Sequence, residues 1–358
     1  MKILQISPLW EDVPPKTYGG TELIVHILCE ELTKRGHYVT LIASKTSNTS
    51  AKLEYTVQKS LRESKTLMPT FFENISAAKV MEISGEFDII HNHCGLAMLP
   101  FHKLLKAPMI NTLHGAFVVN EEVNAYKIFK NLPYISISNS QRNGNKELNY
   151  ISTVYNGINV DQFEFQEKPN LKEPYLTYLG RISREKGVHL AIKLAKQTGW
   201  KLIIAAKIDV NDREYYESEV KHLIDNEKIV YIGEVGHKAK VDLLKNAHAL
   251  IHAVTWPEPF GLTMAESMAC GTPVLALNQG SIPEVVKHGV TGYVENNIDD
   301  LIKRVDDIDK INRSACRKHV EDNFSGKKMV DSYIKAYYKL IGPPKISIVG
   351  LKQKPQTV

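Results

Sequence analysis

Two glutamates that lie eight positions apart, Glu258 and Glu266, have the residue types and the spacing to hold a ligand rich in hydroxyl groups. Glu258 lies between two prolines, which bias the segment away from helical angles, so an extended loop is expected there. Glu266 falls on the next helix, about two turns from its start if that helix begins near Gly261. Carboxylates accept hydrogen bonds from hydroxyl groups such as those of a sugar or a ribose.

The start of this helix adds a place for negative charge. Its free N–H groups at Leu262 and Thr263 would point at whatever Glu258 holds, and such a helix start attracts phosphate. Hydroxyls for Glu258, a pyrophosphate for the helix start and a ribose for Glu266 together describe a nucleotide-sugar. An isolated pair of glutamates at this spacing is more often part of an ordinary helix, so the interpretation depends on the surrounding residues.

A second group of charges follows a predicted strand in the segment 178–187. Gly180 ends the strand, and Arg181 and Lys186 stand on either side of a turn from which both side chains could reach a diphosphate. Arginine offers a bidentate fork and lysine a mobile point charge. A solvated basic loop is the alternative, but the position after a strand, in the same half of the chain as the helix start, favours phosphate binding.

The first half of the chain contributes a glycine turn and a histidine. Gly19 and Gly20 follow the first predicted strand and precede a helix, so their backbone could approach a ligand closely. Their pattern is not the dinucleotide-binding fingerprint, which argues against a nicotinamide-dependent dehydrogenase. His114 lies at the carboxyl end of another predicted strand, where it could bind a sugar hydroxyl or assist proton movement. A plain turn and a structural histidine are the alternatives at these two places.

Two clusters resemble metal sites, and neither satisfies the geometry. His91 and His93 would share one face of a strand while Cys94 points away, and no fourth ligand is nearby in the sequence. Asp307 and Asp309 spell D-x-D inside a polar stretch with no strand before it, which favours a solvated helical face. We therefore predict no metal ion and no cofactor.

The composition describes a globular protein of two domains. The chain has 358 residues, of which 43% are hydrophobic and 24% charged, so each half can bury its own core. The net charge of +5 is too small and too dispersed for nucleic acid but suits an anionic ligand. Four cysteines without a CxxC pair predict reduced thiols and a cytoplasmic protein. No apolar run could span a membrane, which leaves peripheral contact with its inner face.

Short β-rich runs alternate with helical patterns along the whole chain, and several runs are apolar without alternation, as in strands covered on both faces. We predict an α/β fold of two Rossmann-like, doubly wound domains that face each other across a cleft, since such sheets bind ligands beyond the carboxyl ends of their strands. The predicted domains span residues 1–160 and 161–324, and residues 342–358 are expected to be loosely held. The predicted strands cover 2–7, 38–44, 87–93, 108–114, 134–138, 175–180, 201–206, 228–233, 249–254 and 272–277.

Together these residues resemble glycosyltransferase family 4, the retaining transferases with the two-domain GT-B fold. The resemblance extends to about residue 340 and is most specific in the block EPFGLTMAESMACGTPVLA. It also includes YGGTE, TLHG, YNGIN, YLGRISREKG and SIPEVVKHGVTGYV.

The resemblance implies a role for each candidate residue. Arg181 and Lys186 would neutralise the donor diphosphate, Glu258 would hold hydroxyls of the donor sugar, and Glu266 would hold the ribose. The glycine turn would close against the phosphates, and His114 would contact the transferred sugar. The implied catalytic residues are Glu258, His114, Arg181 and Lys186. The implied donor-binding residues are Gly19, Gly20, Arg181, Lys186, Val235, Glu258, Phe260, Gly261, Leu262, Thr263 and Glu266.

The predicted activity is a metal-independent, retaining transfer of a sugar from a nucleotide-diphospho-sugar to a hydroxyl of an unknown acceptor. A nucleotide-sugar epimerase of similar architecture and a non-catalytic nucleotide-sugar binder are the alternatives. The segment 325–341 has an apolar stripe at helical spacing. The resemblance implies that this helix crosses back and docks on the first domain. It also implies that the first domain, 1–160, is the acceptor side and that the second, 161–324, binds the nucleotide-sugar.

Overall fold

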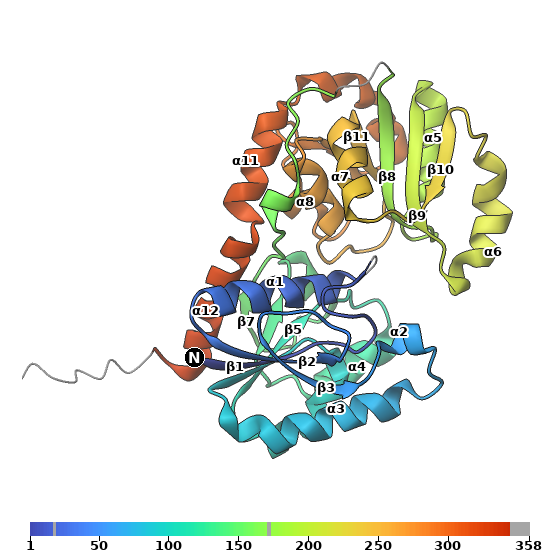
Figure 1. Cartoon of the computed structure of the whole chain (residues 1–358). Coiled ribbons are helices and arrows are strands. Elements are labelled where there is room, and N and C mark those ends of the chain that lie inside the picture. The colour runs from blue at the N-terminus through green and yellow to red at the C-terminus, as the bar shows by residue number, and fades with distance from the viewer. Residues whose placement is uncertain (17–18, 170–172, 344–358) are drawn as a thin grey trace, which may run out of the picture.

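The computed structural model describes residues 1–16, 19–169 and 173–343, so the predicted tail lies outside the described residues from 344 onward. Two parallel sheets, each with its own helices, lie one above the other in Figure 1. We call the first sheet with its helices the first domain and the second sheet with its helices the second domain. The predicted class, a GT-B-like pair of Rossmann-like domains, is confirmed.

The first sheet has seven parallel strands in the order β3-β2-β1-β4-β5-β6-β7, and the second has six in the order β10-β9-β8-β11-β12-β13. The strands of the first sheet are β1 Lys2–Ile6, β2 Tyr38–Ser44, β3 Lys52–Val57, β4 Ile89–Asn92, β5 Met109–Leu113, β6 Tyr134–Ser136 and β7 Tyr150–Thr153. Those of the second are β8 Tyr175–Arg181, β9 Lys201–Lys207, β10 Ile229–Gly233, β11 Ala249–His252, β12 Val274–Leu277 and β13 Gly292–Glu295. In each sheet the strand order reverses beside the first strand, between β1 and β4 and between β8 and β11. Ligands of doubly wound sheets bind outside the carboxyl ends at such a point.

The sequence prediction missed three strands, β3, β7 and β13, and all three are edge strands. Interior strands of these sheets are covered on both faces and are therefore continuously apolar. β3 and β7 are mostly half-buried or exposed, and β13 is half-buried over its last two residues. KLEYTV alternates polar and apolar residues over its six positions, as a half-covered strand does, whereas YIST and GYVE are too short to carry such a pattern.

The helices connect the strands and lie against the two sheets. They are α1 Gly20–Lys34, α2 Leu61–Ser64, α3 Pro69–Ile83, α4 Asn120–Ile128, α5 Val188–Thr198, α6 Arg213–Tyr215, α7 His237–Asn246, α8 Leu262–Ala269, α9 Ile282–Val285, α10 Ile298–Lys303, α11 Arg313–Asn323 and α12 Gly326–Ile341. A 3₁₀ segment, η2 Gly95–Leu104, follows β4. No described helix is long and apolar enough to cross a bilayer.

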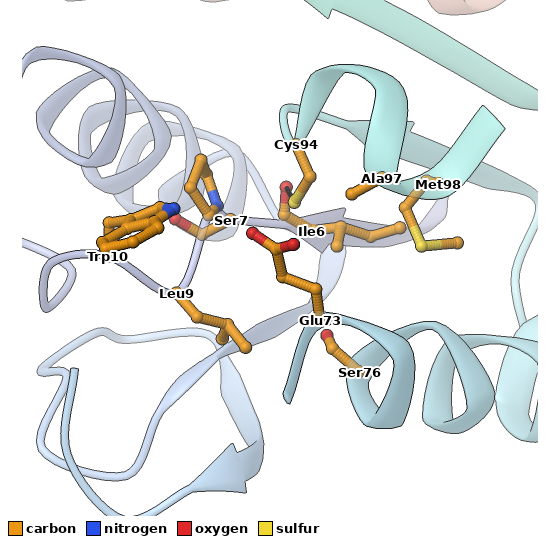
Figure 2. Close-up of a pocket in the computed structure, with 10 residues that line it drawn as sticks. Ile6, Ser7, Leu9, Trp10, Glu73, Ser76, Cys94, Ala97 and Met98 are labelled. Carbon is orange, nitrogen blue, oxygen red and sulfur yellow. Dashed lines mark hydrogen bonds between the residues drawn. The ribbon is translucent and has the colours of Figure 1, made fainter. Parts of the chain in front are cut away.

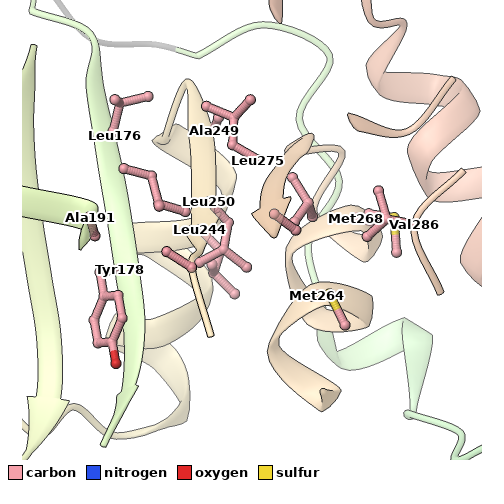
Figure 3. Close-up of a cluster of buried hydrophobic side chains, with 14 of the residues drawn as sticks. Leu176, Tyr178, Ala191, Leu244, Ala249, Leu250, Met264, Met268, Leu275 and Val286 are labelled. Atoms are coloured by element: carbon pink, nitrogen blue, oxygen red, sulfur yellow. The ribbon is translucent and has the colours of Figure 1, made fainter. Parts of the chain in front are cut away.

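The second domain has a continuous apolar core between its sheet and helices (Figure 3). Leu250 of β11 and Leu275 of β12 come from neighbouring central strands, and both are fully buried. Met264 and Met268 lie four positions apart on α8 and are also fully buried, so one face of this helix is fixed against the core. The start of α8 is thereby held in place relative to the carboxyl ends of the strands.

The last helix, α12, runs back to the first domain (Figure 1). It begins after Ser325, whose hydroxyl accepts a hydrogen bond from the N–H of Lys328. Tyr333 and Tyr337 are fully buried, in one apolar cluster with Ile24 of α1. The predicted apolar stripe of this segment is therefore what it buries against the first domain.

Two chain crossings connect the domains, and they are hydrogen-bonded to each other. The N–H of Ile158 donates to the carbonyl of Phe324 over 2.9 Å, and the N–H of Gly326 donates to the carbonyl of Ile158 over 2.8 Å. A Cβ on Gly157 would lie 2.5 Å from the carbonyl oxygen of Ser325, so this close approach requires glycine.

We predict that Tyr337→Ala destabilises the first domain by about 3 kcal/mol or more, because it removes a fully buried ring. It also removes the hydroxyl that bonds Gln5 and His91. Hydrogen exchange of the β1 and β4 amides measures the effect. The control is Lys335→Ala, a truncation on the exposed side of the same helix. Equal protection in the two variants would contradict a structural role of α12 in the first domain.

Candidate functional site

Glu258 lies in the loop between β11 and α8 and is held by two neighbours. The ammonium of Lys186 lies 2.6 Å from Oε2 of Glu258, and the indole N–H of Trp256 donates to the same oxygen over 2.8 Å. The Lys186 ammonium also lies 4.5 Å from the centroid of the Trp256 ring, a cation–π contact. The loop is close to Gly280, where an added Cβ would lie 2.4 Å from backbone atoms of Glu258.

The Glu258 carboxylate is ionised at neutral pH although its side chain is only 8% exposed. Burial alone would raise its pKa, but the charge of Lys186, the nearby His252 and the hydrogen bonds from Lys186 and Trp256 hold the pKa below its ordinary value. The group is therefore a fixed hydrogen-bond acceptor at the end of the second sheet.

Glu266, on α8, has a lysine partner of its own. The Lys240 ammonium lies 2.5 Å from Oε1 of Glu266, whose side chain is 4% exposed. Lys240 belongs to α7, and no motif marks it in the sequence. Glu258 and Glu266 thus each neutralise a lysine from a different element.

The start of α8 lies beside Glu258, as the sequence predicts. Gly261 precedes the helix in the left-handed region, with φ 81°, a conformation that favours glycine. Since α8 begins at Leu262, the N–H groups of Leu262 and Thr263 belong to its first turn and have no partner within the helix. The Phe260 side chain is buried in the core, so only its backbone can serve a ligand.

The start of α1 meets the start of α8 across the two domains. A Cβ on Gly20 would lie 3.6 Å from Cδ1 of Leu262, and Leu262 packs against the apolar clusters of both domains. Two helix starts at one place favour an anion between the domains. Gly19 precedes α1 here, and the nearby Glu22 is buried, which raises its pKa to about 7.

Arg181 faces carboxylates rather than the Lys186–Glu258 pair. Its Nη2 lies 2.5 Å from Oε1 of Glu185, and its Nε lies 3.2 Å from Oδ2 of Asp212. It is the last residue of β8, at the carboxyl end where the sequence analysis placed it. The structure thus brings Lys186 and Glu258 into contact and gives Arg181 other partners.

His114 follows β5 and ends a chain of buried hydrogen bonds. Its Nε2 lies 2.8 Å from Nδ1 of His93, and Nε2 of His93 lies 3.0 Å from Oε1 of Gln5. The Gln5 amide donates to the hydroxyl of Tyr337 over 3.1 Å. Burial lowers the pKa of His114 to about 4, so the ring is neutral at pH 7.

The direction of these hydrogen bonds determines which ring nitrogen of His114 can accept a further hydrogen bond. With the Gln5 amide assigned so that its nitrogen donates to Tyr337, its oxygen accepts from Nε2–H of His93. Nδ1 of the neutral His93 ring must then accept from Nε2–H of His114. Nδ1 of His114 is left as a lone-pair acceptor, suited to a sugar hydroxyl.

The suspected metal clusters take part in other interactions. Nδ1 of His91 lies 2.7 Å from the Tyr337 hydroxyl, and its Nε2 lies 2.7 Å from Oγ1 of Thr112. Asp307 is paired with Lys310 over 2.5 Å, and it also pairs with Arg304. In the described ranges, no group of three His, Cys, Asp or Glu side chains could hold a metal ion.

Several residues at the site belong to no motif that could have identified them in the sequence. Lys240 and Trp256 are noticed only once the fold places them beside the glutamates. His252, at the end of β11, is buried, and its Nδ1 lies 3.5 Å from Oγ1 of Thr263. Val235 lies in the loop after β10, and its side chain packs against an apolar cluster that includes Tyr175.

Comparison with known proteins matches both halves of the chain. The family model described as Glycosyltransferase Family 4 matches residues 18–162, and the model described as Glycosyl transferases group 1 matches residues 159–323. The two models therefore leave only the ends of the chain unmatched.

Individual relatives are distant but similar in length. N-acetyl-alpha-D-glucosaminyl L-malate synthase of Bacillus anthracis is 23% identical over 90% of this chain and 94% of its own. An uncharacterized glycosyltransferase of Methanocaldococcus jannaschii is 25% identical over 82% and 84%. Sucrose-phosphate synthase from Thermosynechococcus elongatus has a similar structure, with TM-score 0.81, 20% identity and coverage of 95% and 99%. HepE of Anabaena, solved with UDP-glucose, has TM-score 0.74, 17% identity and coverage of 95% and 100%. At these identities the solved structures support the fold alone.

We predict that Lys240→Met lowers the free energy of unfolding by roughly 3 kcal/mol, because it leaves the buried Glu266 carboxylate without its partner. The double variant Lys240→Met/Glu266→Gln should recover most of this loss, since no unpaired charge remains. Urea unfolding at pH 7 measures both, with the exposed Lys238→Met as the control. A double variant no more stable than Lys240→Met would show that the pair is not coupled.

Proposed function

Because the chain belongs to glycosyltransferase family 4, we propose that it is a retaining glycosyltransferase that needs no metal ion. It would transfer a sugar from a nucleotide-diphospho-sugar to a hydroxyl group of an acceptor. The observation that carries this proposal is the buried, ionised Glu258, held by Lys186 beside the start of α8.

The donor would lie between the domains, and the site offers one group for each of its parts. Glu258 accepts hydrogen bonds from hydroxyls of the sugar, and Nδ1 of His114 accepts one from the other domain. The helix starts at Gly20 and Leu262 receive the diphosphate. Glu266 accepts hydrogen bonds from the ribose hydroxyls, with Lys240 holding its carboxylate in place.

Departure of the nucleoside diphosphate develops negative charge, and fixed groups of the protein can stabilise it. Lys186, which follows β8, brings positive charge, and Arg181, at the end of β8, would do so by exchanging Glu185 and Asp212 for the diphosphate. The first-turn N–H groups of α8 add preorganised donors that need no reorganisation during the reaction. These groups support a mechanism without a metal ion.

The transferred sugar passes through an oxocarbenium-like state. Glu258 is hydrogen-bonded to Lys186 and Trp256, a geometry that suits positioning of hydroxyls rather than nucleophilic attack. We favour front-face substitution, in which the acceptor oxygen attacks from the side of the leaving diphosphate and its proton passes to a diphosphate oxygen. The configuration at the anomeric carbon is then retained.

The family favours a transferase over the epimerase and the non-catalytic binder that the sequence left open. The relatives described above are named as transferases or synthases, and polar groups from both domains face the proposed donor site. The described cysteines are unpaired, which supports a reducing compartment, and we place the reaction in the cytoplasm with peripheral membrane contact open to test.

We predict that Glu258→Gln and Lys186→Met each lower kcat by about 10²–10³, because each removes a charge beside the reacting centre. Glu266→Gln should instead raise the donor KM with kcat nearly unchanged, since the ribose does not change during the reaction. Steady-state kinetics with the preferred donor measures both, and Glu227→Gln, on the exposed surface, is the control. An unchanged kcat in Glu258→Gln and Lys186→Met, with the donor KM raised as in Glu266→Gln, would overturn this division of roles.

We also predict that transfer survives chelation. EDTA at millimolar concentration should leave the initial rate within about twofold of its value with added magnesium. Loss of transfer in EDTA that manganese or magnesium restores would show that the fixed cations are insufficient.

A further inference from the structure

A cavity of about 220 Å³ lies in the first domain, on the carboxyl side of β1 and β4 (Figure 2). A wider space of about 600 Å³ adjoins it, since Glu73, Cys94 and Ala97 line both. Binding cavities for small ligands typically have about 300–1,000 Å³, so the two adjoining spaces together have the size of such a site.

The cavity lies at the point where the strand order of the first sheet reverses, between β1 and β4. Ser7 and Pro8, which follow β1, form part of its wall, and so does Cys94, which follows His93. His93 is in turn hydrogen-bonded to His114, the residue assigned to the transferred sugar. The cavity therefore adjoins the proposed donor site from the side of the first domain.

Its walls are largely apolar and partly aromatic. Leu9, Trp10 and Met98 line the narrower space, and Phe101 and Tyr126 line the wider one. Trp10 is 41% exposed, so part of its ring is accessible to a ligand. An aromatic face beside polar groups is the usual arrangement for holding a ring that has both C–H and O–H groups.

The polar groups of the two cavities are hydroxyls, the Asn74 amide, the Cys94 thiol and two carboxylates. The hydroxyl of Ser7 is fully buried and has no hydrogen-bond partner among the described residues, although such groups are normally satisfied. The Glu73 carboxylate points into the space between Ser7 and Cys94 in Figure 2. Glu122 lines the wider part. No Lys, Arg or His occurs among the described lining residues.

We propose that these two adjoining cavities are the acceptor site and that the acceptor is a carbohydrate without negative charge. The proposal rests on the transferase function. The sugar ring stacks on Trp10, its hydroxyls donate to Glu73, and the Ser7 hydroxyl gains the partner that it lacks. An acceptor with a carboxylate or phosphate would face Glu73 and Glu122 with no cation to balance it, which is unfavourable in a partly buried site.

The chemistry of the transfer balances with these groups. A hydroxyl oxygen of the acceptor forms the new bond to the anomeric carbon as the bond from that carbon to the diphosphate breaks. The acceptor proton leaves with the nucleoside diphosphate. The products are a glycoside and the nucleoside diphosphate, and neither an oxidant nor a further co-reactant is consumed.

The test begins with the full chain and a panel of UDP-, GDP- and ADP-hexoses, from which thermal shift identifies the donor that binds. Transfer is then measured by mass spectrometry with methyl α-glucoside, methyl α-mannoside, glucosamine, glucose 6-phosphate and L-malate as acceptors. We expect products with the neutral and amino sugars and at least tenfold less with glucose 6-phosphate and L-malate. Preferential transfer to the two anions would overturn the proposal.

Variants locate the acceptor. Glu73→Gln and Trp10→Ala should each raise the acceptor KM at least tenfold while the donor KM stays within twofold, and Glu121→Gln, exposed on α4 beside Glu122, should change neither. Glu73→Lys should shift the preference toward glucose 6-phosphate. An unchanged acceptor KM in Glu73→Gln and Trp10→Ala would show that the acceptor lies elsewhere, even if the donor is used. A protein that neither binds nor consumes any donor of the panel would instead contradict the transferase function itself.

Discussion

Burial of two carboxylates in one loop and helix is the constraint on which the second domain depends. Glu258 and Glu266 are both nearly inaccessible, and an unpaired buried charge would cost several kcal/mol. Each is therefore paired with a lysine from another element, Lys186 from the segment after β8 and Lys240 from α7. The pairs tie three separate segments around the start of α8. The charges that we propose to bind the donor thus also stabilise the fold.

In the first domain, a chain of neutral side chains rather than an ion pair positions the candidate residue His114. His93 and Gln5 carry a chain of hydrogen bonds from His114 at the surface of the domain to Tyr337 on α12. Burial lowers the pKa of both His93 and His114, which keeps both rings neutral at pH 7. The helix that connects the end of the chain to the first domain therefore also sets the direction in which His114 can hydrogen-bond. Its position and the chemistry of the site are linked by four side chains.

Much of the fold could be predicted from the sequence because buried parallel strands are continuously apolar. This pattern is visible within each segment, even when the strands beside it are unknown. β2 was predicted with the bounds that the structure has. The edge strands β7 and β13 are too short to carry a clear pattern, and β3 was missed although its apolar residues alternate. The Glu258 loop and the start of α8 were predicted from prolines and a glycine, whose backbone preferences are local.

The partners of the charged groups could not be predicted in the same way. Lys240 is 26 positions from Glu266 in the sequence, and only the packing of α7 beside α8 brings them together. Arg181 and Lys186 were expected to act as one pair, but the structure directs Arg181 to Asp212 and Lys186 to Glu258. Side-chain pairing of this kind depends on tertiary distance, which a sequence pattern does not encode.

A few polar contacts join the two domains in addition to the chain crossings. Glu284 of the second domain accepts hydrogen bonds from the N–H groups of Asn139 and Ser140 in the first, over 2.9 and 2.7 Å, and from the Tyr155 hydroxyl. Hydrogen bonds to a charged group contribute about 1.5–3 kcal/mol each, far less than a domain core. The two chain crossings, at Ile158 and Ser325, are hydrogen-bonded to each other through the backbone. Their pairing does not depend on the contacts of Glu284. A donor bound as proposed, between the starts of α1 and α8, would add charge-assisted contacts to both domains at once. Its binding energy would then favour an arrangement in which His114 and Glu258 face the same sugar.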